Sequence, residues 1–307
     1  MLPIIRKSIL LGGRQGLKSA WTLLKIMVPV SFAVALLDWT GLLQLLSTAI
    51  SPAFVLFGLP GSAALAFVSG ALLNCYSAIA VMITLPMTGR ETTLLALMVL
   101  FFHNIPIEAV VQKKAGSSAL FMVLYRLAAA LLGGVALNFM MPGHAPDFAR
   151  NAAALPIVTV VPFTQMLAAW SAKSLLLIAK ITLLIVGLMT LNRFLEESRA
   201  ALHLSRALGP LLRLMGLTPE TGFLFVVANT LGLAYGGGVI MAEREAGKIS
   251  DRDIRELNVF IATCHSLLED TLLFVAIGAS APWITFPRLV IATVAVWAYR
   301  ALVSRRR

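Results

Sequence analysis

Charged residues are scarce in this chain. Only 13% of its 307 residues are Asp, Glu, Lys or Arg, whereas a soluble globular domain carries about 25%. Hydrophobic residues make up 59% of the chain. So few polar side chains cannot cover a water-facing surface, and the composition therefore indicates a multi-pass membrane protein.

Cysteine and the common catalytic motifs are also scarce or missing. The two cysteines, Cys75 and Cys264, lie inside apolar stretches; this predicts buried thiols and excludes a disulfide framework. There is no HExxH, Walker loop, CxxC or GxSxG motif. We therefore expect no enzymatic activity and no cofactor. The glycine-rich stretch 12–16 predicts a flexible turn.

The net charge of +11 raises the alternatives of a nucleic acid or a membrane as partner. The lysines and arginines flank apolar stretches and do not form one basic domain. This distribution is typical of membrane spans with positive flanks. We expect a lipid bilayer as partner and no nucleic acid, and we expect the run Arg305–Arg307 to set topology or to contact anionic lipid.

The sequence contains two related halves. Each half carries a proline, a Gly-Leu turn, an apolar run with a tyrosine, and a histidine followed by acids. Pro52 and Pro210 lie 158 residues apart, whereas His103 and His265 lie 162 residues apart. A slow drift in the offset is what short loop insertions leave after a duplication, so the pattern predicts an internal repeat.

The apolar stretches predict an all-α fold with six membrane spans, because a spanning helix needs about 20 apolar residues. We place these spans at residues 21–47, 92–112, 117–141, 170–193, 254–277 and 286–303. Two further apolar runs, 61–86 and 220–241, are predicted to be re-entrant helical hairpins.

Charge placement favours these hairpins over two additional spans. If both runs enter and leave on one side, nineteen of the 25 basic residues lie on or near the cytoplasmic side, as the positive-inside rule requires. Each half then crosses the membrane three times. An odd number of crossings inverts the second copy, and inverted repeats with re-entrant elements are typical of transporters.

We divide the chain accordingly. A basic interfacial helix (1–20) precedes the first repeat (21–141). A proline-rich linker (142–169) leads to the inverted second repeat (170–303), which includes an amphipathic helix (194–214). A basic tail (304–307) ends the chain.

Polar and ionisable residues inside the apolar stretches are the candidate site, because such groups are costly in a membrane. Asn104 and Glu108 share a helix face, and Ser266 and Asp270 take the corresponding places in the second copy. Glu269 is an additional acid there. Pro106 predicts a kink in the first copy only. The candidate substrate- or ion-binding residues are Asn74, Ser77, His103, Asn104, Glu108, Asn229, Tyr235, His265, Ser266, Glu269 and Asp270.

A structural role for the same residues is the alternative. The acids could tie helices together through salt bridges, with Arg126 and Lys180 as partners, and the polar residues of the hairpins could satisfy their own backbone. A metal site built from His103, His265 and the carboxylates is chemically feasible, but the spacing selects no metal.

Several motifs together resemble the nucleoside-recognition (Gate) family: Gly58-Leu59-Pro60, Gly70 to Asn74, Gly89-Arg90-Glu91 and the string Cys264 to Thr271. The family includes spore maturation proteins A and B and the Gate regions of the ferrous iron transporter. It is similar in its repeat plan to concentrative nucleoside transporters. The resemblance covers nearly the whole chain and implies recognition of a nucleoside-like solute.

These observations lead to two expectations for function. The first is a secondary transporter of a small polar solute or ion, which binds near the membrane midplane between the repeats and is coupled to protons or cations through Glu108 and Asp270. The second is a non-transporting scaffold of the spore-maturation type. We expect a bacterial inner-membrane protein with both termini in the cytoplasm; the sequence leaves a homo-oligomer open.

Overall fold

The computed structural model describes residues 2–143, 161–198, 200–230 and 232–304, and these ranges contain helices and no strand. Six helical stretches are long and apolar enough to cross a membrane. Their bounds are Ile5–Trp39, Gly89–Lys114, Ala119–Met140, Phe163–Leu195, Asp251–Val275 and Ala281–Leu302. The prediction of an all-α polytopic membrane protein is confirmed. The inverted orientation of the repeats and the re-entrant course of the hairpins stay predictions.

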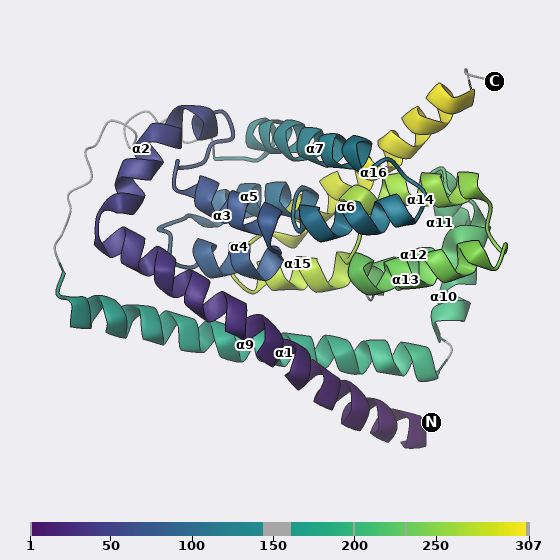
Figure 1. Ribbon diagram of the computed structural model, residues 1–307, viewed down its shortest axis with the longest axis horizontal. Coiled ribbons are helices and arrows are strands. Elements are labelled where there is room, and N and C mark those ends of the chain that lie inside the picture. The colour runs from purple at the N-terminus through teal and green to yellow at the C-terminus, as the bar shows by residue number, and fades with distance from the viewer. Residues whose placement is uncertain (1, 144–160, 199, 231, 305–307) are drawn as a thin grey trace.

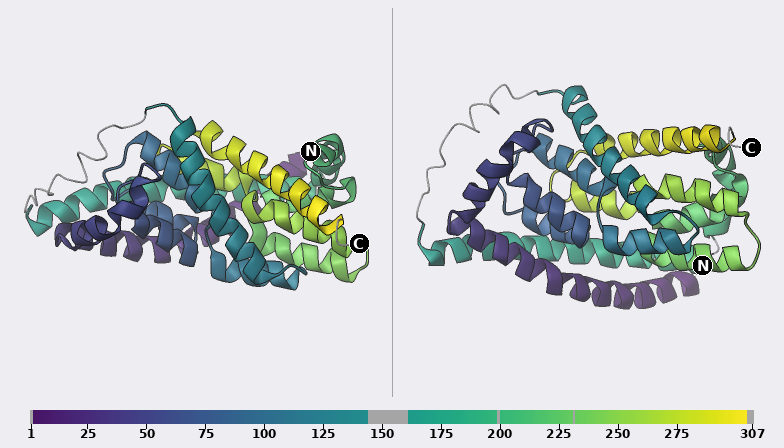
Figure 2. Two further views of the ribbon diagram at one scale, coloured as in Figure 1. Left: turned by 90° about the horizontal axis from the view of Figure 1, so that it is seen from above. Right: turned by 45° about the horizontal axis from the view of Figure 1, so that its top comes forward.

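The long helices share one general direction (Figure 1). The N- and C-termini lie toward the same end of the molecule in all three views (Figures 1 and 2). Helices α7 (Ala119–Met140) and α16 (Ala281–Ser304) run along the face opposite α1 and α9. Both ends of the chain thus lie where an even number of spans would place them, and the side of the membrane stays a prediction.

Helices α1 (Leu2–Trp39) and α9 (Phe163–Glu197) form a long antiparallel pair. Lys7 donates to Glu197 at 3.0 Å near one end, and the rings of Trp39 and Phe163 meet near the other. The hydrogen bond from Lys7 lowers the pKa of Glu197 below its ordinary value.

The structure shifts the predicted boundaries of the first span. The limit set at residue 20 falls inside α1, which runs through the expected interfacial segment as one helix. The span predicted to reach residue 47 ends at Trp39, where Gly41 adopts φ 76° before α2 (Leu42–Val55). A glycine in the left-handed region ends a helix readily, and the sequence analysis overlooked it.

The glycine-rich stretch 12–16 is helical, so the flexible turn expected there is wrong. Gly12 and Gly16 lie on one face of α1, and a Cβ atom at either position would lie 2.6 Å from a backbone Cα of α9. These atoms belong to Thr190 and Val186. Small residues four apart let helices in membranes approach closely. Their role is therefore packing.

Two pairs of short helices occupy the predicted hairpins. The first is α3 (Ala63–Leu72) with α4 (Cys75–Met82), and the second is α12 (Gly222–Thr230) with α13 (Gly232–Glu245). The first pair is interrupted before Asn74, whose side chain caps α4 by accepting from the Ser77 amide at 2.9 Å. In the second pair Gly232 has φ 73°.

Two of the spans are broken near their centres. Helix α5 (Gly89–Phe101) is followed by α6 (Ile105–Lys114), and α14 (Asp251–Thr263) is followed by α15 (Leu267–Val275). Asn104 has φ 51° and Ser266 has φ 48°, a conformation that non-glycine residues seldom adopt. The kink predicted from Pro106 is a full break. The expectation that the second copy lacks it is wrong, since Ser266 makes the same break without a proline.

The remaining predicted segments are placed only in part. The amphipathic stretch 194–214 comprises the end of α9, α10 (Ala200–Ala207) and α11 (Gly209–Leu214), followed by the 3-10 turn η1 (Pro219–Thr221). Most of the linker and residues 305–307 of the basic tail lie outside the described residues.

The hydrophobic interior divides into two clusters centred on the two halves, although Leu177, Ile181 and Ile185 of α9 belong to the first cluster. The first surrounds α5, whose residues from Thr92 to Phe101 are all buried, and the second surrounds α14. Leu273 and Phe274 of α15 pack into the first cluster, whereas Ala115 and Met122 of the first half pack into the second. The halves are thus interlocked through the ends of their broken helices.

The close contact between α1 and α9 predicts a large effect of a small substitution. Gly16→Val should push the helices apart and lower the free energy of unfolding by about 1–3 kcal/mol, the usual effect of overpacking. Gly13→Ala is the matched control, because a Cβ atom there meets nothing within 4 Å. Thermal unfolding in detergent measures both, and an equal melting temperature for Gly16→Val and Gly13→Ala would contradict the packing role.

Candidate functional site

The free backbone carbonyls at each helix break are bound by a buried arginine. Arg126 of α7 donates to the carbonyl oxygens of Phe101 and His103, both at 2.8 Å. Arg288 of α16 donates in the same way to the carbonyls of Thr263, at 3.3 Å, and His265. A broken helix leaves carbonyls without partners, which is costly at membrane depth. The arginines therefore make both breaks stable.

The two arginines correspond to each other in the repeat. Arg126 and Arg288 lie 162 residues apart, the same offset that separates His103 from His265. The sequence-based predictions include Arg126 only as a structural partner and assign no role to Arg288. Their shared offset was the signal that could have identified them as a pair.

Each break also touches the hairpin of its own half. The Asn104 amide donates to the Gly70 carbonyl at 2.9 Å, and the Ser266 amide donates to the Ala228 carbonyl at 3.3 Å. Gly70 and Ala228 stand 158 residues apart, the offset found at the repeated prolines. Equivalent contacts in the two halves bring the interruption of each hairpin beside the break of a span.

The two histidines at the breaks face each other with fixed tautomers. His103 Nδ1 lies 3.1 Å from the Val99 carbonyl oxygen, and His265 Nδ1 lies 2.6 Å from that of Ile261. A carbonyl only accepts, so in each ring Nδ1 carries the hydrogen. The ring centroids are 5.1 Å apart. Both Nε2 atoms are directed toward the carboxylates in between.

Glu108 lies at the centre of this group. Its Oε2 accepts from Arg126 Nη1 at 2.5 Å, and its Oε1 lies 3.4 Å from His103 Nε2 and 3.3 Å from His265 Nε2. Asn104 Nδ2 donates to the same Oε1 at 3.4 Å. All of these groups except Asn104 are buried. Glu108 is therefore a buried carboxylate with its counter-charge in place.

Asp270 occupies the equivalent place in the second half without the equivalent partner. Arg288 Nη1, which corresponds to the nitrogen that binds Glu108, has no hydrogen-bond partner among the described residues, and neither does Asp270 Oδ2. We attribute the missing bond to the aspartate side chain, which is one methylene shorter than glutamate. Asp270 Oδ2 lies 3.9 Å from His103 Nε2 instead. The two breaks are therefore alike in their arginine–carbonyl bonds but differ in the pairing of this acid.

A cavity of about 650 Å³ opens onto these groups. It is lined by residues of both halves and by the helix pair α1 and α9, including Gln15, Lys18 and Met189. The contribution of α1 is not among the sequence-based predictions. The predicted site residues that line the cavity are Asn74, His103, Asn104, Glu108, His265, Ser266, Glu269 and Asp270.

The other predicted site residues have different surroundings. Ser77 is fully buried and binds the Asn74 side chain, and Asn229 is bonded to the Phe225 carbonyl and the Leu267 amide. Both satisfy local backbone or capping needs, and the structure does not bring them to the cavity. The side chain of Tyr235 lies outside the described residues.

Glu269, the acid without a counterpart in the first copy, joins the two halves. Tyr76 of the first hairpin donates its hydroxyl to Glu269 Oε1 at 2.6 Å. This bond crosses from α4 to α15 at the wall of the cavity. Opening the cavity between the halves would have to break it.

Comparison with known proteins agrees with these features. The family model described as nucleoside recognition (Gate) matches residues 20–136, close to the first predicted repeat. A protein of Bacillus subtilis (strain 168) named uncharacterized membrane protein YvoD is 32% identical over 274 residues, which cover 89% of this chain and 88% of that protein. The chain belongs to the nucleoside-recognition (Gate) family of membrane proteins. The resemblance drawn from its motifs is confirmed, and no solved structure matches this Gate protein.

The unequal partners of the two arginines predict unequal effects when they are replaced. Arg126→Met leaves the Glu108 carboxylate buried without its counter-charge and should lower the free energy of unfolding by about 3–5 kcal/mol. Arg288→Met, the matched control, removes bonds to carbonyls only and should lower it less. Thermal melting of the two variants in detergent measures the difference, and a larger loss for Arg288→Met would contradict the proposed pairing.

Lengthening Asp270 should complete the second charge pair. Asp270→Glu adds the methylene by which Glu108 reaches Arg126, and the cavity beside residue 270 offers room for it. We expect a higher melting temperature for this Gate protein, because Arg288 Nη1 gains a buried ionic partner. Glu108→Asp is the reciprocal variant and should melt lower. A lower melting temperature for both variants would show that side-chain length does not explain why Glu108 is paired and Asp270 is not.

Proposed function

We propose that this protein is a membrane permease that binds a small, nucleoside-like polar solute in the central cavity. The observation that carries the proposal is the cavity itself, which gathers ionisable groups of both halves at two broken helices. Broken helices that meet at a binding site between two repeats are typical of secondary transporters. Amide and hydroxyl groups of Asn74, Asn104 and Ser266 on the wall offer donors and acceptors to such a solute.

Coupling to a proton or cation is assigned to the two acids in different roles. Glu108 is held by the charged Arg126 side chain, with both histidine rings beside it, so it serves as a fixed counter-charge. Asp270 has a free carboxylate oxygen beside the cavity. A carboxylate without a permanent partner can bind and release a proton or cation as its surroundings change. Asp270 is therefore the coupling residue in this proposal.

A non-transporting scaffold is the second candidate, and one observation favours it. Such a role predicts that the acids form salt bridges with Arg126 or Lys180, and Glu108 does pair with Arg126. Lys180 is exposed on α9 and forms no ion pair in the described part of the chain. The free oxygen of Asp270 and the cavity beside it support the permease over the scaffold.

The cellular setting follows from the same features. With six spans, both termini lie on the same side of the membrane. By the positive-inside rule, the distribution of basic residues favours the cytoplasm as that side. We therefore propose a multi-pass protein of the bacterial inner membrane with the lipid bilayer as its surroundings. Nucleic acid is not a partner in this proposal, and a homo-oligomer stays open.

Uptake into proteoliposomes tests the permease. With radiolabelled uridine as the probe, the protein should support exchange across the membrane and accumulation driven by a pH gradient. Asp270→Asn should lower the accumulation at least tenfold and leave exchange intact, because neutral Asn cannot carry the coupling charge.

Glu245→Gln is the matched control, since this exposed acid lies at the end of α13 away from the cavity. It should transport like the unaltered protein. Uridine uptake no greater than that of empty liposomes, or accumulation unchanged by Asp270→Asn, would contradict the proposal.

A further inference from the structure

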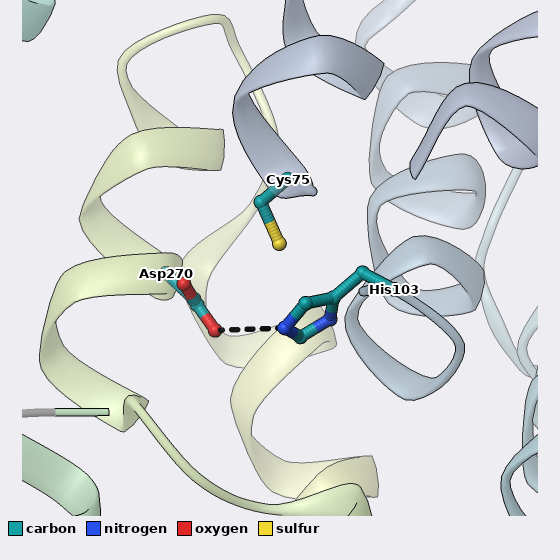
Figure 3. A group of neighbouring side chains, drawn as sticks. All are labelled: Cys75, His103 and Asp270. Atoms are coloured by element: carbon teal, nitrogen blue, oxygen red, sulfur yellow. Dashed lines mark ion pairs between the residues drawn. The ribbon is translucent and has the colours of Figure 1, made fainter. Parts of the chain in front are cut away.

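Three side chains that chelate metals meet at the wall of the cavity. Cys75 Sγ, His103 Nε2 and an Asp270 carboxylate oxygen lie within 4.8 Å of one another, and all three residues are buried. They come from the first residue of α4, the break after α5, and α15 (Figure 3). In Figure 3 the thiol points between the imidazole and the carboxylate. The three groups therefore converge on one point.

The imidazole is already oriented for ligation. Because His103 Nδ1 donates its hydrogen to the Val99 carbonyl, Nε2 presents its lone pair to the space between Asp270 and Glu108. Metal-bound histidines commonly donate their other ring nitrogen to a backbone carbonyl in this manner. Nε2 and the carboxylate oxygen both carry lone pairs at 3.9 Å, an arrangement that a shared cation would stabilise.

One oxygen of the Asp270 carboxylate is unsatisfied in the described part of the chain. Asp270 Oδ2 has no hydrogen-bond partner among the described residues, and the residue is 6% exposed. A buried carboxylate oxygen without a partner is costly unless something binds it. This unsatisfied oxygen is an observation independent of the cysteine and the histidine, and it is directed at the same point.

We propose that Cys75 Sγ, His103 Nε2 and Asp270 Oδ2 bind a divalent transition-metal ion of the zinc type. A thiolate with an imidazole favours such an ion over Mg²⁺ or Ca²⁺, which prefer oxygen ligands. Tetrahedral zinc places its ligand atoms about 3.3–3.6 Å apart, so the side chains need to close by only a fraction of their present separation. Binding converts the Cys75 thiol to a thiolate and releases its proton.

The charges of this triad favour it over a neighbouring one. Cys75 thiolate and Asp270 carboxylate together neutralise a divalent ion, which suits a buried site. His103, Glu108 and His265 form a second group of suitable residues, but Glu108 is already neutralised by Arg126. His103 also has only one free nitrogen, so the two groups cannot both use it.

The site goes beyond the proposed transport activity, and its occupancy is measured without transport. Three protein ligands leave a fourth position, and the cavity lies beside all three residues. The metal would join the first hairpin and the first break to α15 of the second half. Its binding is expected to hold the two halves together at the cavity.

Metal binding by the purified full-length protein in detergent tests the assignment. After treatment with a chelator and a reductant, Zn²⁺ should bind with one ion per chain, and excess Mg²⁺ should not displace it. Co²⁺ as a spectroscopic probe should give a thiolate-to-cobalt absorption band. Cys75→Ser should abolish that band, and Asp270→Asn should weaken Zn²⁺ binding at least tenfold.

Cys264→Ser is the matched control, because Cys264 is equally buried and belongs to neither metal-binding group. It should keep both the band and the affinity. The assignment is overturned if no Zn²⁺ is retained, if Cys75→Ser binds as tightly as the unaltered protein, or if the band disappears in Cys264→Ser. Melting curves without metal show that each variant is folded before binding is compared.

Discussion

The architecture depends on the bonds between two buried arginines and the carbonyls of two broken helices. A helix interrupted at membrane depth exposes polar backbone groups, and water is not there to satisfy them. Arg126 and Arg288 each supply a planar guanidinium with several donors, and each spans the break from a neighbouring helix. These bonds allow Asn104 and Ser266 to take a left-handed conformation and bring the histidines and acids to one centre.

Much of the fold was predictable because its signals are local. Hydrophobic length predicted the six spans found among the described residues, whereas the division into two repeats stays a prediction. The break at Ser266 was missed because its cause is distant: no proline marks it, and the stabilising group, Arg288, follows 22 residues later on another helix. Gly12 and Gly16 were misread for the same reason, since their value depends on α9, which lies far along the sequence.

The candidate site was predictable in its residue types but not in its division of roles. The sequence places His, Asn or Ser, and an acid at matching positions in the two halves. It cannot show that Glu108 is paired and that Asp270 is not, because that outcome depends on the reach of two side chains toward two arginines. Cys75 was likewise expected to be an inert buried thiol. Its position beside His103 and Asp270 arises from packing α4 against the break.

The difference between Glu108 and Asp270 also bears on how a duplicated protein acquires a new property. Two identical halves would hold two closed charge pairs and an electrically symmetric centre. Aspartate and glutamate codons differ by a single base. A single-base change can therefore remove one carboxylate–arginine pair and leave the hydrogen bonds from that arginine to the backbone carbonyls in place. In the predicted repeat, one copy of the framework thus preserves the structure and the other is free to diverge toward chemistry.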